Sequence, residues 1–432
     1  MTIATVDREL HLCVNITYSG KHEAAWRTAE NPRAIVDVDY YRAIARTAER
    51  GAFDAVLIPD TPALPSNASE TPWNAMEPSI LLTAIGSVVD NIGLIGTAST
   101  TFNEPFNLAR RFASLDHVTS GRGALNVVTT MNAAAAANFG LRTLPDRAER
   151  YSRAAEFVEI LVRLWESWDE GAFLAEQSSG RFVDMARVRS LDHVGDRFSV
   201  RGPLNVPRSP QGRPVLFQAG DGGRAMAARF ADAVFTAQTV RERAQEFRAS
   251  LRAEAQRVGR RPEDVAVMPG LLVIVGSTER EAMERKDELD VYLDPHRELT
   301  RLAHRLGLEP DDLSLDEPIP VEAVRSRRFE TSRAFHESTV ALAIEEKLTV
   351  RQLLARNPGA HRLVVGTPEQ VADDMELWFR SNAADGFVLN ANTFPSGLED
   401  FVDHVVPELR RRGIFRNAYT GTTLRHHLGA TL

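Results

Sequence analysis

The sequence predicts an α/β fold, a (β/α)8 barrel of parallel strands with two insertions. Short apolar segments alternate with amphipathic helical segments along the 432 residues. Residues 214–235 show the repeating unit most clearly, as an apolar run, a turn of sequence AGDGG and an alanine-rich amphipathic segment. A doubly wound open sheet is the alternative. Such a sheet usually carries a glycine-rich first turn, and the first connection here has none.

Eight segments are short, apolar and rich in β-branched residues, as strands are. In chain order they are 10–16 (LHLCVNI), 54–58 (DAVLI), 92–99 (IGLIGTAS), 124–129 (ALNVVT), 215–218 (VLFQ), 233–236 (AVFT), 265–275 and 386–390 (GFVLN). Because helical segments separate them, the strands are expected to run parallel, with the active site at their carboxyl ends.

Seven segments carry apolar residues at the spacing of one helix face. They are 38–50, 78–89, 105–117, 151–168, 242–257, 367–381 and 398–412. The first ends at Gly51, as helices often end at glycine. The third opens with Pro105 in its first turn, where proline is tolerated.

We expect one domain, residues 1–432, with insertions at about 169–213 and 278–359. The first insertion is polar and rich in Gly, Pro and Arg, with a hairpin around RFSVRGPLNV, and is expected to pack on the barrel edge. The second is helical and charged. Both are expected to roof the pocket.

Composition limits the function classes. The net charge of −8 favours neither a nucleic-acid nor a membrane partner. Cys13 is the only cysteine, so no internal disulfide can form, and the N-terminus lacks a signal-peptide pattern. We therefore expect a cytoplasmic protein. No His, Cys and Asp cluster has metal-ligand spacing, so no metal site is expected.

Polar residues follow several of the predicted strands. His22, Asp60, Thr97, Asn126 and the glycine turn all lie near strand ends, without an evident acid–base pair. This pattern suggests that a cofactor supplies the chemistry. Structural roles stay open for each residue, since Asp60 can cap a turn, Thr97 can pack within the sheet, and the glycine turn can be an ordinary βα turn.

Longer motifs resemble a known family. SLDHVTSGRGALNVVTT is followed by AANFG and ERY, then by WESW, VRGPLNVPRSPQGRPVLFQAG, HVVPELRRRGIFR and TTLRHHLG, with GKHEAAWR near the N-terminus. This series resembles the flavin-dependent monooxygenases of the nitrilotriacetate and dibenzothiophene-sulfone monooxygenase type, within the bacterial-luciferase-like superfamily. The resemblance covers nearly the whole chain.

The resemblance implies a barrel that binds reduced FMN supplied in trans by an NAD(P)H:flavin reductase. Flavin and O2 would form a C4a-hydroperoxide that inserts one oxygen atom into a small organic substrate. A homodimer or homotetramer is expected on the same ground. The alternatives are a deazaflavin-dependent hydride-transfer enzyme of the same superfamily and a non-catalytic flavin-binding protein.

The resemblance also suggests site residues. The cofactor-binding candidates are Asp60 and Thr97 beside the isoalloxazine, Asn126 at its strand end, Arg147 and Tyr151 near the phosphate, and Ala219, Gly220, Asp221 and Gly222 as the phosphate loop. His22 is the catalytic candidate. The chain departs from the family pattern at two of these positions. Arg147 stands where the family usually has histidine, and Gly222 stands where it usually has serine.

Overall fold

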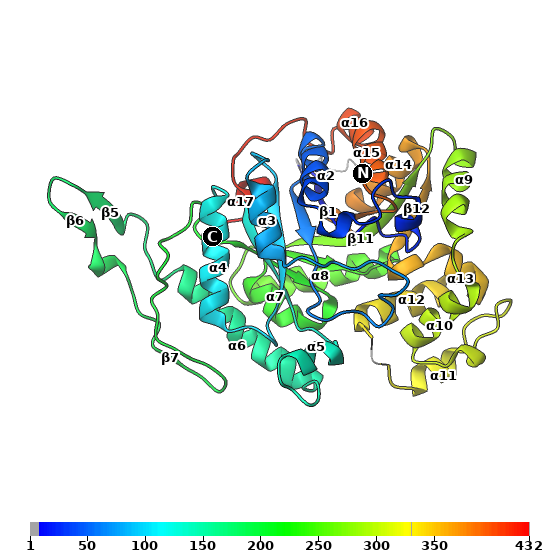
Figure 1. The fold of residues 1–432 in the computed structure, drawn as a ribbon, viewed down its shortest axis with the longest axis horizontal. Coiled ribbons are helices and arrows are strands. Elements are labelled where there is room, and N and C mark those ends of the chain that lie inside the picture. The colour runs from blue at the N-terminus through cyan, green and yellow to red at the C-terminus, as the bar shows by residue number, and fades with distance from the viewer. Residues whose placement is uncertain (1–7, 330, 432) are drawn as a thin grey trace.

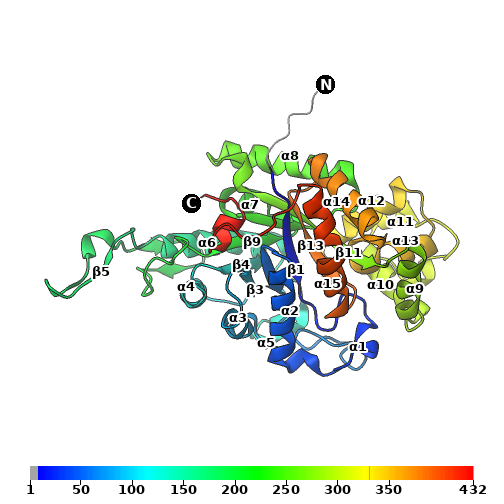
Figure 2. The ribbon, with the colours of Figure 1, turned by 90° about the horizontal axis from the view of Figure 1, so that it is seen from above.

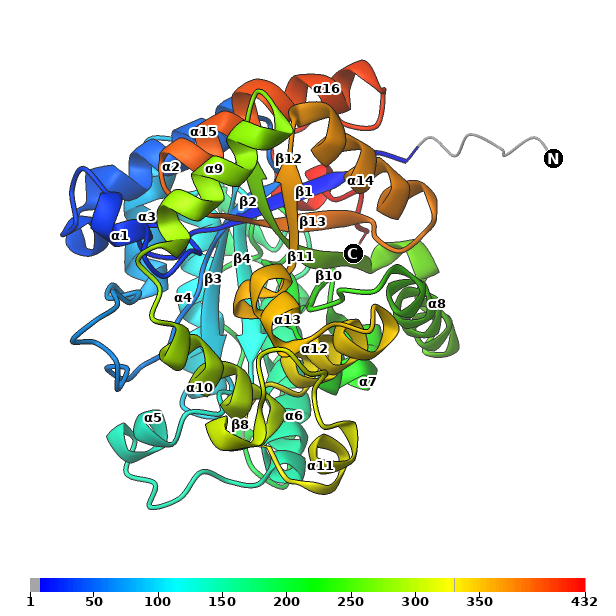
Figure 3. The ribbon, with the colours of Figure 1, turned by 90° about the vertical axis from the view of Figure 1, so that its right-hand side faces the viewer.

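A computed structural model describes residues 8–329 and 331–431, with all side chains except those of Asp221 and Pro358. Within this part of the chain, eight parallel strands form a barrel enclosed by helices (Figures 1, 2 and 3). The barrel strands are β1 (His11–Asn15), β2 (Ala55–Ile58), β3 (Gly93–Ser99), β4 (Gly123–Val128), β9 (Val215–Ala219), β10 (Ala233–Thr236), β11 (Ala266–Val275) and β13 (Gly386–Ala391). Every predicted strand is present.

The barrel closes between its first and last strands. Cys13 of β1 lies opposite Ala55 of β2 on one side and opposite Val388 of β13 on the other. The remaining strands follow in chain order through β10 and β11, which pair in parallel. The (β/α)8 prediction is confirmed, and the closure rules out an open sheet.

The strands alternate between two faces, as a pleat requires. Cys13, Phe217, Phe235 and Met268 belong to the cluster that fills the lumen. At the amino-terminal end of the barrel, Leu424 of the short helix α17 (Leu424–His427) packs against Gly93 and closes the floor. The barrel can therefore open only at its carboxyl end.

Helices that cover the barrel match the predicted segments within a few residues. They are α2 (Val38–Arg50), α3 (Pro78–Gly86), α4 (Pro105–Val118), α6 (Arg147–Trp165), α7 (Arg224–Phe230), α8 (Arg241–Arg257), α14 (Pro368–Arg380) and the run of α15 (Ser396–Asp400), a π-helical turn (Phe401–Val405) and α16 (Val406–Arg411). The largest shift is at α6, which starts four residues before the predicted residue 151. The Asp146 side chain caps it by accepting a hydrogen bond from the Glu149 amide at 2.8 Å.

One strand was not predicted. β12 (Arg362–Gly366) pairs with Leu271–Val275, the half of β11 that extends past β10 and pairs on its other side with β13. β12 is only five residues long, and its apolar run of three residues, Leu363–Val365, comes soon after the charged second insertion, so it was not recognised as a separate strand. Together, β12 and the extension of β11 form a wall above the barrel mouth.

The second insertion builds on this wall. It contains α9 (Glu279–Asp290), α10 (Pro295–Leu306), α11 (Val321–Ser326), α12 (Arg333–Glu345) and α13 (Val350–Arg356). Leucine side chains from α10, α12 and α13 form a small core of their own. Figure 3 shows α10 to α13 gathered as one group beside the barrel strands.

The first insertion lies at the opposite end of the molecule (Figures 1 and 2). It contains the hairpins β5 (Phe173–Glu176)–β6 (Arg181–Val183) and β7 (His193–Val194)–β8 (Ser199–Val200). The predicted hairpin around RFSVRGPLNV is partly confirmed, because β8 lies in it but pairs with residues before it. The β5–β6 hairpin extends away from the barrel, whereas Leu191, Phe198 and Leu204 of the same insertion are buried in the main core. The prediction that this insertion packs on the barrel edge is therefore confirmed for its second part. Its residues line neither of the two cavities at the barrel mouth, so the prediction that it roofs the pocket was wrong.

Two short helices complete the fold, α1 (Ala25–Thr28) in the loop after β1 and α5 (Ala133–Asn138) after β4. In the described part of the chain, no helix has both the length and the apolar character needed to cross a membrane.

Buried aspartates fix the floor of the barrel. Three of them directly precede β2, β10 and β13, and each accepts hydrogen bonds from a neighbouring strand and from an arginine. Asp54 accepts from Leu12 and Arg416, Asp232 from Leu216 and Arg425, and Asp385 from Val267 and Arg248. Burial alone would raise the pKa of Asp54, but Arg416 and His11 lower it to about 2. These pairs hold the strand ends that lie farthest from the open mouth.

Candidate functional site

A polar layer lines the lumen at the carboxyl ends of the strands. Asn126 Nδ2 donates to Thr97 Oγ1 at 3.1 Å, since these residues lie opposite each other on β4 and β3. Asn15 Nδ2 donates to Asn390 Oδ1 at 3.0 Å across the β1–β13 junction. The Oδ1 atoms of Asn15 and Asn126 are buried and accept no hydrogen bond from described residues. Buried polar atoms normally have partners, so these oxygens fit a ligand with N–H donors.

Asp60 stands two residues beyond β2, at the same end of the barrel. Burial and the nearby Glu77 carboxylate raise its pKa to about 6, against a smaller opposing effect of Arg111. The Asp60 carboxyl group therefore binds its proton more tightly in the folded protein than in the unfolded chain. The ionised carboxylate destabilises the fold above pH 6, and this effect fades as the pH falls from 6 towards 4.

Arg147, Tyr151 and Gly222 meet at a corner beside the mouth. Arg147 and Tyr151 lie one turn apart on α6, with the guanidinium carbon 4.9 Å from the centre of the Tyr151 ring. A Cβ atom added to Gly222 would lie 2.3 Å from Tyr151 Oη and 2.7 Å from Arg147 Nη2. The absence of a side chain at Gly222 therefore makes room for both polar groups, and we call these three residues the arginine corner.

The predicted glycine turn has the expected form. Ala219 ends β9, Gly220 has a φ of 86°, and residues 221–223 form a 3₁₀ turn that leads into α7. The positive φ explains the glycine at position 220. The Asp221 backbone belongs to the turn, whereas its side chain lies outside the described part of the structure.

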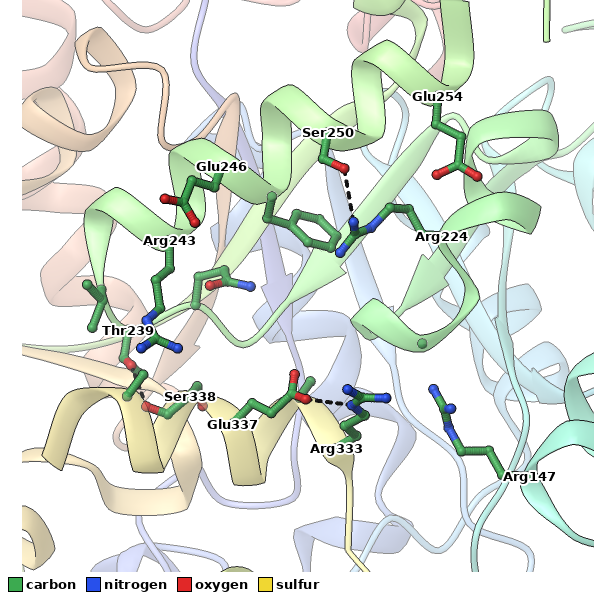
Figure 4. A pocket seen from close by; sticks show the side chains of 16 residues that line it. Arg147, Arg224, Thr239, Arg243, Glu246, Ser250, Glu254, Arg333, Glu337 and Ser338 are labelled. Carbon is green, nitrogen blue, oxygen red and sulfur yellow. Dashed lines mark hydrogen bonds and ion pairs between the residues drawn. The ribbon is translucent and has the colours of Figure 1, made fainter. Parts of the chain in front are cut away.

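A cavity of about 720 Å³ opens from the arginine corner, between α7 and α8 on one side and α12 on the other (Figure 4). Arg147 and Arg333 point into it from different elements (Figure 4), and Arg333 pairs with Glu337 at 2.5 Å. Arg224, which immediately follows the turn, donates instead to Ser250 Oγ of α8 at 2.9 Å. Of these three arginines, Arg147 has the side chain that approaches the Cβ position of Gly222 most closely.

A second cavity, of about 320 Å³, lies where the β11 extension meets α9, α10 and α13. Its lining includes Lys21, His22, Leu272, Ile274 and Asn392. We call it the lysine cavity. Leu272 and Ile274 lie on the same face of β11 as Met268, because every second residue of a strand faces the same side. The cavity therefore continues the lumen beyond the carboxyl end of the barrel. The expectation that the second insertion roofs a pocket is confirmed.

His22 is fixed at the wall of the lysine cavity. Its Nδ1 accepts the Ala24 backbone N–H at 3.1 Å, which places the ring proton on Nε2. Nε2 then donates to Asp290 Oδ1 at 3.0 Å. Because both nitrogens are engaged, the geometry favours a positioning role, and a catalytic role for His22 stays a prediction.

Sequence reasoning missed His361. Its ring lies against Gly270 on the lumen face of β11, where an added Cβ would be 2.3 Å from Nδ1. Burial and the positive charges of Lys21 and Arg305 lower the pKa of His361 well below its usual value, so the ring is neutral. Its buried Nδ1 has no partner among the described residues. The only local signal is a histidine before the short strand β12, which was itself not predicted.

Apart from Asp60, which stands by itself beyond β2, the predicted side chains of the described part fall in three places at the carboxyl end of the barrel. Thr97 and Asn126 lie in the lumen layer, Arg147, Tyr151 and Gly222 form the arginine corner, and His22 lies in the lysine cavity. Among the described residues, no three His, Cys, Asp or Glu side chains are grouped so as to hold a metal ion.

Comparisons with known proteins agree with the resemblance found in the sequence. A sequence model of the luciferase-like monooxygenase family matches residues 17–386. Nitrilotriacetate monooxygenase component A of Aminobacter aminovorans is 40% identical over 441 residues, covering 98% of this chain and 97% of its own. The structure of EDTA monooxygenase from Chelativorans sp. BNC1 is similar, with a TM-score of 0.85, 36% identity, and coverage of 98% and 99% of the two chains. Riboflavin lyase, solved with a modified FMN and riboflavin, gives a TM-score of 0.83 at 30% identity, covering 98% of this chain and 96% of its own.

Proposed function

This chain belongs to the luciferase-like monooxygenase family, and we propose that it is the oxygenase component of a two-component, FMN-dependent monooxygenase. The observation that carries the proposal is the lumen layer, where the Oδ1 atoms of Asn15 and Asn126 are buried without a partner among the described residues. The isoalloxazine of reduced flavin has ring N–H donors that match such acceptors. A barrel mouth lined by such amide and hydroxyl groups is suited to holding a cofactor that supplies the chemistry.

The residues present fit FMN at both of its ends. Asn15, Thr97 and Asn126 supply amide and hydroxyl groups in the lumen for the ring system. The arginine corner supplies a guanidinium and a phenol for the phosphate, and guanidinium groups bind phosphate strongly through paired N–H donors. We also assign Asp60 and the turn Ala219–Gly222 to the flavin site, as the sequence suggested.

Bound reduced FMN supplies two electrons, with which one atom of O2 enters the substrate and the other leaves as water. The chain itself binds and orients the flavin and the substrate and excludes water from the barrel mouth. The closed floor beneath Leu424 leaves a single route for the reactants, through the carboxyl end. The partners are a small organic substrate, O2 and a separate flavin reductase that delivers the reduced cofactor.

We extend the proposal to the assembly, location and organisation of the protein. A homodimer or homotetramer is supported by exposed apolar side chains on the first insertion, including Phe173, Phe182, Met185 and Val194. A cytoplasmic location is supported by the single, buried Cys13. One domain over residues 1–432 is supported by the closure of the barrel by β13, near the end of the chain.

The test is an anaerobic titration of the purified protein with reduced FMN, followed by rapid mixing with air-saturated buffer. We expect saturable binding and a rate of flavin reoxidation that differs from that of free reduced FMN. Oxygen incorporation from ¹⁸O2 into a product would then identify the substrate in a screen. No saturable binding, together with reoxidation at the rate of free flavin, would contradict the proposal. The same titration with a reduced deazaflavin would then test the hydride-transfer alternative.

A further inference from the structure

We propose that the lysine cavity binds a carboxylate group of the substrate through the ammonium group of Lys21, so that the substrate is a small organic acid. This inference rests on the proposed function and specifies the substrate class. The observations that support it are the charge pairing within the cavity, the half-buried position of Lys21 and the residues that line the cavity.

The carboxylates at the wall of the cavity are already paired. Glu23 and Glu298 both contact Arg301. Asp290 forms an ion pair with Lys286 of its own helix and accepts a hydrogen bond from His22 Nε2. Because Glu23 and Glu298 share one arginine, the described lining keeps one carboxylate in excess, and Glu298 acts electrostatically on the neighbouring Arg305 rather than forming an ion pair with Lys21.

Arg351, the one arginine of the described lining, is paired too, through Asp316 at 2.9 Å. Lys21 differs from these groups. Among residues 8–329 and 331–431, no carboxylate lies within ion-pair distance of its ammonium group. Its backbone N–H is held by Ala391 O at 2.8 Å, so the residue is fixed beside the end of β13. Lys21 is the cation of the lining that a ligand can neutralise.

A second cation lies near Lys21. Arg305 donates to the carbonyl and side-chain oxygens of Asn357, and no described carboxylate contacts it. Burial, followed by repulsion from Arg305, lowers the pKa of Lys21 to about 8. Burial also lowers the pKa of Arg305, to about 10. Two partly desolvated cations at one place disfavour each other, and a bound anion relieves both effects.

Lysine is rare in this chain, so its presence in the cavity is informative. The sequence has 51 basic residues, of which only Lys21, Lys286 and Lys347 are lysines and the other 48 are arginines. Two of the three lysines line the lysine cavity. Lysine presents a compact point charge, whereas arginine presents a broad planar fork. A compact charge suits a cavity of about 320 Å³.

The remaining walls fit the carbon skeleton of such a substrate. Leu272, Ile274, Leu354 and Leu363 give the cavity an apolar side opposite the charged groups. A neutral apolar substrate would fill this side but would bury the Lys21 ammonium unpaired, which is unfavourable. A carboxylate joined to a short apolar chain satisfies both sides.

The small number of lysines allows a direct test of this proposal. The protein is acetylated with trace acetic anhydride at pH 8, and the rates at Lys21 and Lys347 are measured by peptide mass spectrometry. Acetate, succinate and tricarballylate are added in turn as probes, with dimethyl succinate as the uncharged control. We expect at least one acid to slow acetylation of Lys21 tenfold or more without changing Lys347, which is exposed on a surface loop. If none of the acids protects Lys21, or if dimethyl succinate protects it equally, the proposal is overturned.

Variants give a second readout through calorimetric titration with the protecting acid. Lys21→Met is expected to weaken binding tenfold or more, and Lys21→Arg, which keeps the charge on a broader group, is expected to weaken it less than Lys21→Met does. Lys347→Met, the matched loss of a surface lysine, is expected to bind like the unmodified protein. Unchanged binding to Lys21→Met would overturn the proposal. Each variant is also titrated with reduced FMN, so that failure of flavin binding, which concerns the proposed function, is seen separately from failure of acid binding.

Discussion

Replacing Gly222 with alanine tests the arginine corner most directly. The new Cβ would lie 2.3 Å from Tyr151 Oη and 2.7 Å from Arg147 Nη2. An ordinary contact begins near 3.4 Å, so the hydroxyl must retreat by about 1 Å and the guanidinium by somewhat less. The φ angle of Gly222 lies outside the left-handed region, so alanine adds no backbone strain there. The substitution therefore moves two polar groups and leaves the turn intact.

The expected effect is on phosphate recognition alone. A hydrogen bond to a charged group contributes about 1.5–3 kcal/mol, so losing one such bond to phosphate would weaken binding by roughly 10- to 150-fold. Riboflavin has the same ring system and ribityl chain as FMN but no phosphate. We therefore expect Gly222→Ala to weaken FMN binding by this factor and to change riboflavin binding by less than about twofold.

The assay is an anaerobic titration of each protein with reduced FMN and with reduced riboflavin. A double-mutant cycle with Arg147→Ala provides the control. If the methyl group added at position 222 acts by displacing Arg147, the substitution has a smaller effect when Arg147 is absent. An unchanged preference for FMN over riboflavin in Gly222→Ala, or a fully additive cycle, would refute this reasoning.

Three further predictions follow from the described contacts. Asp60→Asn should raise the free energy of unfolding at pH 8 by on the order of 1 kcal/mol, because it removes a carboxylate that is unfavourable in the folded state. Urea titrations should show this gain shrinking as the pH falls from 6 to 4, where Asp60 becomes protonated. Asp54→Asn should lower the free energy of unfolding by about 3 kcal/mol, because it leaves Arg416 buried without its partner. Since the folded pKa of Asp54 is about 2, that loss should hold above about pH 4 and shrink only at lower pH, and a loss that disappears already at pH 6 would contradict it. Gly270→Ala should displace His361 and slow substrate turnover by roughly tenfold, with reduced FMN binding unchanged by titration.

Much of the barrel follows from local sequence. Each strand around the lumen is buried on both faces, so its residues form an apolar run that stands out between helical segments. Helix ends followed from capping residues, although the cap at Asp146 was missed because the apolar stripe of α6 begins several residues later. β12 was missed because its apolar run is only three residues long and comes soon after the charged second insertion. Its pairing with the half of β11 that extends past β10 is visible only in the fold.

The candidate site was less predictable. Thr97 and Asn126 could be placed together, because both lie near the carboxyl ends of adjacent parallel strands. The contact between Gly222 and Arg147 joins residues far apart in the chain. Both positions depart from the family pattern, and only the fold shows that they lie next to each other. The role of Lys21 depends on charges contributed by distant helices, so its local sequence gives no sign that it lacks a partner among the described carboxylates.

β11 is long enough to extend past β10, and this extension separates the proposed flavin site from the part of the chain that lines the lysine cavity. Its first half pairs with β10. Its second half pairs with β13 of the barrel and also with β12, beside which lies a separate cluster of helices that has its own leucine core. The proposed flavin residues lie in the barrel, on α6 and in the turn before α7, whereas much of the lysine cavity is built from the second insertion. Mutations in the second insertion can therefore change which substrate is bound while the proposed flavin-binding residues stay the same. Exchange of segment 278–359 between relatives is accordingly a natural route to engineered oxygenases with new substrates.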